Sequence, residues 1–232
     1  MRQYLKQLIR EWRSVLIGVC IGAAVTLVII EGIVQVNYHE TPLPYQKSSA
    51  ATAWLPSTVK KWAPEIDRQA KKYNIDANFV AIILTLESGG YSQADSGVAK
   101  GLMQVTDPTG KDIAKMYLKK SVKHYDLYDS KTSIEFGTAY LAHLRTTLCD
   151  YSDGPSWDSC VEAIAAGYNG GPGAALNLIN GKGLTDTQTI IYSRNAFNMW
   201  RERGAKTSPT FDRWQEAGGQ RLIDAAAKEK SS

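Results

Sequence analysis

The chain has 232 residues, a formal net charge of +4 and a hydrophobic fraction of 44%. This composition is ordinary for a globular protein and excludes disorder throughout the chain, and the length allows one domain with accessory segments. Part of the positive charge lies in residues 1–13, and no later run of Arg or Lys is interleaved with aromatic residues. We therefore expect no nucleic-acid partner.

The first predicted element is an apolar segment near the N-terminus. Residues 14–30 carry no charge, basic residues precede them within 1–13, and Glu31 follows. A helix of this length spans about 25 Å, at the lower limit for crossing a bilayer. We predict a transmembrane signal anchor over residues 14–33 in contact with inner-membrane lipid, with residues 1–13 cytoplasmic and the rest of the chain outside, on the periplasmic side. A cleaved signal peptide is the alternative.

A linker and the start of a helical domain follow. Residues 34–56 include Pro42, Pro44 and Pro56, which is typical of a linker. Four residues then recur at steps of four and three, the spacing of one helix face: Trp62, Ile66, Ala70 and Tyr73.

The next predicted helix covers residues 77–86. Asp76 can cap its N-terminus, and Gly89 and Gly90 end it. Further helices are predicted over residues 107–119, 133–148, 156–168, 174–180 and 186–203. The fold class is mainly α, with residues 57–205 as the folded domain.

Residues 206–232 are predicted to be a tail. A helix over 212–228 is weakened by Gly218 and Gly219, and we interpret the tail as a solvated appendage.

Glu87 is the leading candidate for a catalytic residue. Residues 79–86 before it are almost wholly apolar, and a glycine pair follows it closely. Burial disfavours the charged carboxylate and raises its pKa, and a carboxyl protonated near neutral pH can act as a general acid. The alternative is an exposed glutamate at a helix end, which is the usual situation for this residue type.

Five motifs in order give this sequence a family resemblance. They are Glu87-Ser88, Gly-Leu-Met-Gln-Val at 101–105, a Ser-Ile and Tyr-Leu pattern at 129–141, Tyr-Asn-Gly-Gly-Pro-Gly at 168–173, and Tyr192. Over residues 57–203 the chain resembles the soluble-type (family 1) lytic transglycosylases. The resemblance implies a lysozyme-like α fold of the goose-type or SLT kind. It also implies cleavage of the β-1,4 bond between N-acetylmuramic acid and N-acetylglucosamine in peptidoglycan strands, with a 1,6-anhydromuramoyl product and no cofactor.

The resemblance also implies roles for individual residues. Glu87 matches the single catalytic acid, which protonates the glycosidic oxygen and then takes a proton from the C6 hydroxyl of the sugar. Ser88 would orient Glu87 or the acetamido group of the substrate, and Met103 and Gln104 would line the cleft. Ser88 as a helix-end polar residue and Met103 as a core residue are the structural alternatives.

Three later residues complete the expected substrate site. Asn169 could hydrogen-bond the sugar, Tyr168 could contact it or only pack, and the hydroxyl of Tyr192 could reach Glu87 or remain structural. Gln188 and Ile190 depart from the family pattern around Tyr192, which puts the flanking contacts in question.

A hydrolytic muramidase is the nearest alternative in chemistry. Such an enzyme normally uses two carboxylates, and the only nearby candidate, Asp95, lies in a sequence typical of a turn. We therefore expect attack by the substrate itself, with Glu87 as the sole acid and base. A third hypothesis is a catalytically silent glycan-binding scaffold within a secretion, conjugation or phage machine of the envelope.

Cysteine and histidine usage predicts a disulfide and no metal site. Outside the cytoplasm, Cys149 and Cys160 would close a short loop, and free thiols are the alternative. His39, His124 and His143 are scattered without ligand spacing.

Overall fold

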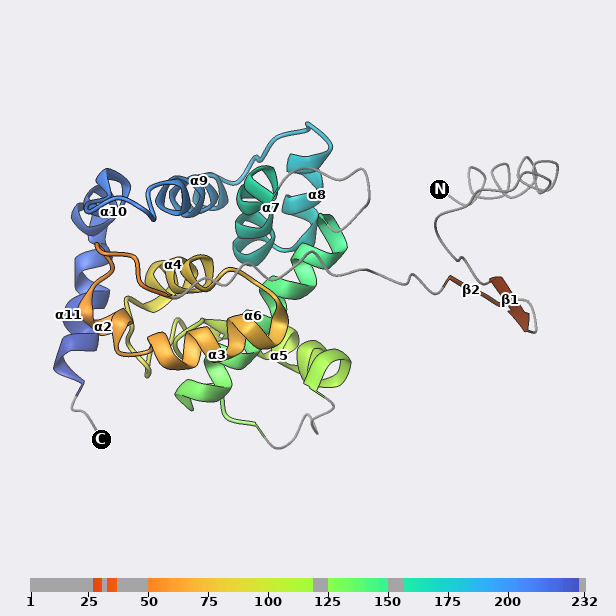
Figure 1. The fold of residues 1–232 in the computed structure, drawn as a ribbon, viewed down its shortest axis with the longest axis horizontal. Helices are drawn as coiled ribbons and strands as arrows, with labels where there is room; N and C mark the ends of the chain where they lie inside the picture. Colours follow the sequence, from red (N-terminus) through yellow and green to blue (C-terminus); the bar gives the residue numbers. More distant parts are fainter. Residues whose placement is uncertain (1–26, 31–32, 37–49, 119–124, 150–156, 230–232) are drawn as a thin grey trace. The chain divides into compact units, whose positions relative to one another are not determined.

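A computed structural model describes residues 27–30, 33–36, 50–118, 125–149 and 157–229 (Figure 1). The chain divides into two compact units, Met1–Thr41 and Pro42–Ser232. In the first unit, strands β1 (Leu27–Ile30) and β2 (Ile33–Val36) form an antiparallel pair.

Most of the predicted membrane anchor lies outside the described residues, as do residues 1–13 and 37–49. The described residues of this segment, 27–30 and 33, belong to strands β1 and β2 and not to the expected helix. No helix among the described residues is both long and apolar enough to cross a bilayer.

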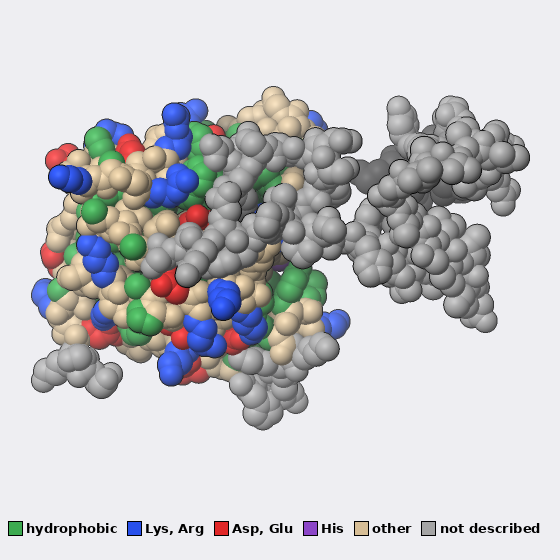
Figure 2. Space-filling view, viewed as in Figure 1, with side chains coloured by type: hydrophobic (Ala, Val, Ile, Leu, Met, Phe, Trp, Pro, Cys, Tyr) green, Lys and Arg blue, Asp and Glu red, His purple; other side chains and the backbone are tan. Residues whose placement is uncertain are grey.

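The second unit is mainly helical, as predicted. Its elements are α2 (Ser57–Lys60), α3 (Ala63–Tyr73), α4 (Ala77–Ser88), β3 (Ala99–Lys100), β4 (Val105–Thr106), α5 (Asp107–Ile113), η2 (Ala114–Leu118), α6 (Ser130–Leu148), α7 (Trp157–Gly170), α8 (Pro172–Ile179), α9 (Thr187–Arg201), α10 (Pro209–Trp214), η3 (Gln215–Gly219) and α11 (Gln220–Lys228). On the face shown in Figure 2, basic and acidic side chains are interspersed.

Helix α4 forms the centre of the core, between α3 and α9 (Figure 1). The side chain of Asp76 accepts hydrogen bonds from the amides of Asn78 and Phe79 at 2.8 and 3.2 Å, which caps the helix as predicted. Gly89 ends it in the left-handed conformation, with φ 59°. The helix therefore runs two residues beyond the predicted end at residue 86 and includes Glu87.

Other helix boundaries also differ from the sequence prediction. Helix α5 ends at Ile113, where η2 follows, and Thr106 caps its start, because its hydroxyl accepts the Thr109 amide at 3.3 Å. Helix α6 begins at Ser130, where Asp129 caps it. Helix α7 continues to Gly170, which places Tyr168 and Asn169 on a helix.

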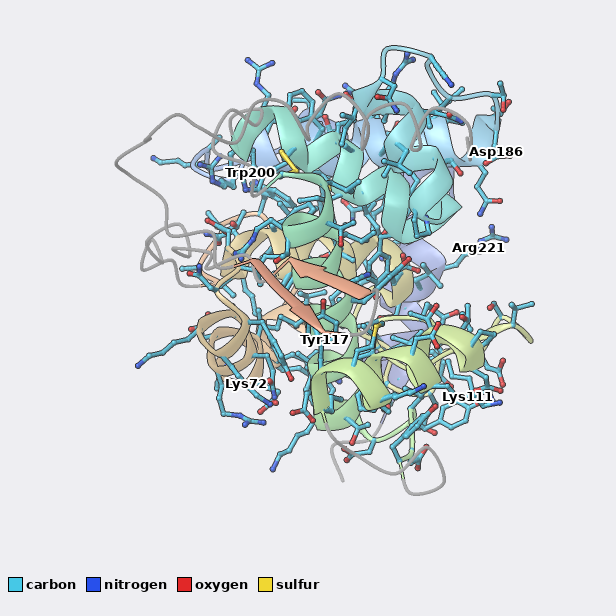
Figure 3. All side chains as sticks on the ribbon, turned by 90° about the vertical axis from the view of Figure 1, so that its right-hand side faces the viewer. Lys72, Lys111, Tyr117, Asp186, Trp200 and Arg221 are labelled. Carbon is cyan, nitrogen blue, oxygen red and sulfur yellow. A yellow bond between two sulfur atoms is a disulfide. The ribbon has the colours of Figure 1, made fainter. Side chains whose placement is uncertain are left out.

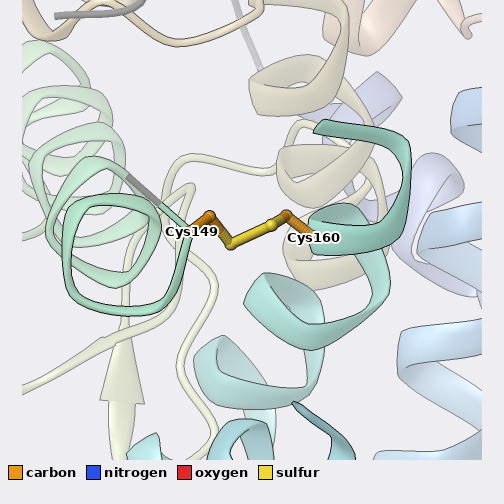
Figure 4. Close-up of a disulfide and its surroundings, with 2 residues drawn as sticks. All are labelled: Cys149 and Cys160. Atoms are coloured by element: carbon orange, nitrogen blue, oxygen red, sulfur yellow. A yellow bond between two sulfur atoms is a disulfide. The ribbon is translucent and has the colours of Figure 1, made fainter. Parts of the chain in front are cut away.

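The predicted disulfide is present between Cys149 and Cys160 (Figure 4). Their Cα atoms lie 6.1 Å apart. The bond joins the end of α6 to the first turn of α7.

The C-terminal segment packs against the domain, which contradicts its interpretation as a solvated appendage. Phe211 and Ala226 are 6% and 2% exposed. Gly218, with φ 122°, bends the chain, and a Cβ at Gly219 would lie 2.4 Å from the Trp214 ring. The glycine pair thus allows a close-packed bend between α10 and α11, where the sequence suggested only a weak helix.

Candidate active site

Glu87 and Tyr192 meet where α4 packs against α9. Glu87 is the penultimate residue of α4, and Tyr192 lies in the second turn of α9, which Asp186 caps. The Tyr192 hydroxyl donates a hydrogen bond to Oε1 of Glu87 at 2.5 Å. Asp186 and Trp200, near the two ends of this helix, are labelled in Figure 3.

The surroundings of Glu87 favour its protonated form. Burial raises the pKa of Glu87 from 4.5 to about 7, against the opposing effect of the hydrogen bond from Tyr192. Burial, followed by the negative charge of Glu87, raises the pKa of Tyr192 well above its usual value. The carboxyl can therefore both donate and accept a proton near neutral pH, while the phenol remains a hydrogen-bond donor.

Tyr168 belongs to the same electrostatic environment. Burial raises its pKa well above the usual value, and the charge of Glu87 is the next cause. Its ring lies 5.3 Å from that of Tyr140. The structure therefore brings Tyr168 and Tyr192 together around Glu87.

Ser88 lies beneath this site and not on its surface. Its side chain is fully buried, and its hydroxyl donates to the carbonyl of Leu102 at 2.8 Å. The same oxygen accepts the Gly90 amide at 3.2 Å. Ser88 therefore ties the end of α4 to the segment around Leu102, and its hydroxyl does not face solvent.

Met103 is also buried, with 0% of its surface exposed. Its amide donates to the Ser133 hydroxyl at 3.1 Å, and its carbonyl accepts the Tyr168 hydroxyl at 2.7 Å. A Cβ at Gly137 would lie 2.5 Å from the Met103 side chain. In this conformation Met103 is a core residue, and its backbone orients Tyr168.

Gln104 stabilises the loop that follows α4. It adopts a positive φ of 44°, and its Nε2 donates to the carbonyls of Ala94 and Gly101, each at 3.0 Å. A Cβ at Gly101 would lie 1.9 Å from the Leu127 carbonyl oxygen, so this position requires glycine.

Asn169 connects α7 to α9. Its Oδ1 accepts a hydrogen bond from the Thr189 hydroxyl at 3.1 Å, one turn before Tyr192. Asn169 is half-buried, so the structure gives it a positioning contact and leaves part of its surface exposed.

Asp95 has a different environment from Glu87. Its carboxylate is exposed and accepts hydrogen bonds from the Tyr128 hydroxyl at 2.5 Å and the Gly97 amide at 2.6 Å. Both hydrogen bonds lower the pKa of Asp95, and the one from Tyr128 has the larger effect. No group of three or more His, Cys, Asp or Glu side chains among the described residues could hold a metal ion.

Two residues that hold the end of α4 were not identified from the sequence as site residues. Thr58 donates its hydroxyl to the Gly89 carbonyl at 2.7 Å, and the indole of Trp62 donates to the Gly90 carbonyl at 3.2 Å. The helical periodicity identified Trp62 only as a core residue. No local pattern marks either contact, because the partners lie about 30 positions apart in the chain.

Comparison with known proteins gives concordant matches. The chain is 34% identical over 130 residues to membrane-bound lytic murein transglycosylase C of Serratia proteamaculans, covering 54% of this chain and 36% of that protein. The protein of the same name from Shigella sonnei is 33% identical over 129 residues, covering 54% and 35%. The chain thus spans about a third of the length of these relatives.

A solved structure and a family model also match this chain. Lytic transglycosylase Slt from Pseudomonas aeruginosa aligns with a TM-score of 0.46 and 18% identity, over 63% of this chain and 25% of that one. The family model for the transglycosylase SLT domain matches residues 64–191. Because this match covers more than half of the 232 residues, the chain belongs to the transglycosylase SLT domain family.

Proposed function

We propose that this protein is a peptidoglycan lytic transglycosylase in which Glu87 is the only general acid and base. It cleaves the β-1,4 bond between N-acetylmuramic acid and N-acetylglucosamine and leaves a 1,6-anhydromuramoyl end. The observation that carries the proposal is the Glu87 carboxyl, with a pKa raised to about 7 and a hydrogen bond from Tyr192. Family membership and the names of the two relatives support the same reaction class.

The mechanism uses one carboxyl twice. Protonated Glu87 donates its proton to the glycosidic oxygen as the bond to C1 of the muramoyl sugar breaks. The acetamido group of the substrate stabilises C1. The Glu87 carboxylate then takes the proton of the C6 hydroxyl, and the oxygen of that hydroxyl bonds to C1. Glu87 ends the cycle protonated, and no water is consumed.

Tyr192 would stabilise the intermediate state of this cycle. Its hydroxyl donates to Glu87, so the hydrogen bond is strongest when the carboxyl is ionised. Tyr168, Asn169 and Gln104 are the remaining candidates for sugar contacts. Ser88 and Met103 would contribute from inside the protein, by fixing the segments that carry the site.

A second carboxylate for direct hydrolysis finds less support. Asp95 is an exposed carboxylate with a lowered pKa, and it accepts hydrogen bonds from Tyr128 and from the Gly97 amide of its own loop. The transglycosylase reaction needs no such partner.

The same proposal includes the location of the protein. Residues 14–33 would anchor it in the inner membrane with residues 1–13 in the cytoplasm, and a linker would join the anchor to the folded domain. That domain is larger than the predicted 57–205, and the linker shorter than the predicted 34–56, because Ala50, Trp54 and Leu55 before it and Phe211 after it are buried in the same core. This arrangement places Glu87 outside the cytoplasm, where peptidoglycan is. An envelope machine for secretion, conjugation or phage passage is the proposed class of protein partner.

Digestion of purified sacculi with the wild-type protein and Glu87→Gln tests the reaction. Mass spectrometry should find anhydromuramoyl ends with the wild type and at least a hundredfold fewer with the variant, since general acid catalysis contributes roughly 10²–10⁴-fold. Glu216→Gln is the matched control, because Glu216 is exposed.

Three results would contradict the proposal. Cleavage that survives Glu87→Gln would exclude Glu87 as the acid. Reducing muramic ends without anhydro ends would indicate a muramidase. Glycan binding without any cleavage by the wild type would indicate a silent scaffold.

A further inference from the structure

The turn after the catalytic helix is enclosed by two distant parts of the chain. A Cβ at Gly89 would lie 2.8 Å from the backbone nitrogen of Ile223 in α11. A Cβ at Gly90 would lie 2.2 Å from the carbonyl oxygen of Thr58 in α2. The backbone that follows Glu87 is therefore packed directly against the backbone of both α2 and α11.

A single carboxylate joins these three segments at their edge. Glu229, directly after α11, accepts a short hydrogen bond from the Ser92 hydroxyl and forms an ion pair with Lys61 at 3.1 Å. Ser92 lies just beyond the Gly89-Gly90 turn, and Lys61 is the C-terminal cap of α2. Only 18% of the Glu229 side chain is exposed, so these contacts are partly shielded from water.

The charge state of Glu229 suits this role. Burial works to raise its pKa, but the hydrogen bonds from Ser92 and Lys61 outweigh burial, and the net pKa is below the usual value. Glu229 is therefore ionised wherever Glu87 titrates.

We propose that α11 and Glu229 form a positioning element for Glu87. By clamping the Gly89-Gly90 turn against α2, they fix the last turn of α4 and with it the position of the Glu87 carboxyl relative to Tyr192. The C-terminal segment is then a functional part of the catalytic domain. This inference rests on the proposed catalytic role of Glu87.

The test compares Glu229→Ala and Glu229→Gln with the control Glu216→Ala in the full chain. Glu229→Ala removes the carboxylate that Ser92 and Lys61 share, whereas Glu229→Gln keeps an acceptor for Ser92 and loses only the ion pair with Lys61. Glu216 lies in the same C-terminal segment, is exposed, and carries the same charge. Circular dichroism first establishes a temperature at which all variants are folded.

Two readouts are needed. The first is kcat and KM for release of anhydromuramoyl products from sacculi. We expect Glu229→Ala to lower kcat about tenfold with little change in KM, because small displacements of a catalytic group are costly. The kcat of Glu229→Gln should lie between those of Glu229→Ala and the wild type.

The second readout is the pKa of Glu87, followed by NMR of ¹³C-labelled glutamate carboxyls and assigned by the signal lost in Glu87→Gln. We expect this pKa to change in Glu229→Ala and to remain unchanged in Glu216→Ala.

The second readout does not depend on activity, so it separates the two proposals. If the wild type cleaves nothing, a shifted Glu87 pKa in Glu229→Ala still supports the positioning element. If folded Glu229→Ala retains the wild-type kcat and the wild-type Glu87 pKa, the positioning role is refuted, whatever the reaction.

Discussion

At the scale of single residues, the pair of Glu87 and Tyr192 combines two opposing effects. Burial raises the pKa of Glu87, and the hydrogen bond from Tyr192 lowers it. The net pKa of about 7 is the balance of the two. A carboxyl without the tyrosine would hold its proton more tightly and give it up less readily.

Tyr192→Phe should therefore raise the pKa of Glu87 further. The proton-donating form of Glu87 then persists to higher pH, and the alkaline limb of the pH profile of kcat/KM moves to higher pH. We expect kcat to fall roughly tenfold to a hundredfold, because loss of one such donor weakens stabilisation of the ionised state. Steady-state kinetics on sacculi between pH 5 and about 9 would measure both effects.

Tyr128→Phe is the matched control for this experiment. It removes a hydroxyl bonded to the exposed carboxylate of Asp95, and we expect no shift of the profile. An alkaline limb that moves in Tyr128→Phe instead would identify Asp95 as the titrating acid.

At the scale of secondary-structure elements, the end of α4 depends on a glycine for two separate reasons. Gly89 has a positive φ of 59°, and it packs against the backbone of α11. Gly97 also has a positive φ, 80°, but nothing lies within 4 Å of a Cβ there. Alanine variants at Gly97 and Gly89 therefore separate the cost of the left-handed conformation from the cost of the close contact with α11.

We expect Gly97→Ala to lower the free energy of unfolding by about 1–2 kcal/mol, the cost of the left-handed conformation. Gly89→Ala should lower it by a further 1–3 kcal/mol or so, because the added methyl overpacks against α11. Urea denaturation of both variants would measure the difference. Equal losses in the two variants would argue against close packing of α11 on Gly89.

The disulfide joins two neighbouring helices, α6 and α7. Cys149 and Cys160 are 11 residues apart, and closing a loop of that length contributes about 2–3 kcal/mol in the chain-entropy model. The double variant Cys149→Ser, Cys160→Ser should lose this amount in urea denaturation under oxidising conditions. The wild type treated with a reductant should match the double variant, and a wild type insensitive to the reductant would contradict the expectation.

The sequence predicted helices well where local chemistry defines their ends. Asp76 and Asp186 cap α4 and α9, and Gly89 ends α4, as their residue types suggest. Thr106 and Asp107 are both suitable caps, so sequence alone could not choose between them.

The orientation of site residues was less predictable than their identity. Ser88 follows Glu87 directly, but successive residues on a helix differ by about 100° in direction, and Ser88 points to the buried carbonyl of Leu102. The Met103 side chain packs closely against Gly137, and α11 packs closely against Gly89. Each of these contacts joins segments that are distant in sequence, so no local pattern reveals them.

At the scale of the whole molecule, Glu87 makes stability depend on pH. The folded state holds its proton up to a pKa of about 7, whereas an exposed glutamate in the unfolded state loses it near 4.5. Between these values the folded state binds more protons, so the free energy of unfolding falls as pH rises, by at most roughly 3 kcal/mol from this residue. Below pH 4.5 this residue contributes no slope.

Glu87→Gln should remove this contribution. We expect the variant to be more stable than the wild type at pH 8 and the difference to shrink toward pH 5. Urea denaturation across this range would measure it, with Glu216→Gln as the control of unchanged pH dependence. A wild type that loses no stability relative to Glu87→Gln over this range would show that Glu87 titrates as an ordinary exposed glutamate.

The contact between Gly89 and Ile223 has a consequence for the order of events during synthesis. A ribosome makes α4 long before α11, and the two residues in contact are 134 positions apart (223 minus 89). A nascent chain that has emerged only as far as α9 already contains Glu87 and Tyr192, but the turn behind Glu87 still lacks one of its two packing surfaces. The packed form of the helix end that carries Glu87 is therefore reached only after residue 223 has been translated.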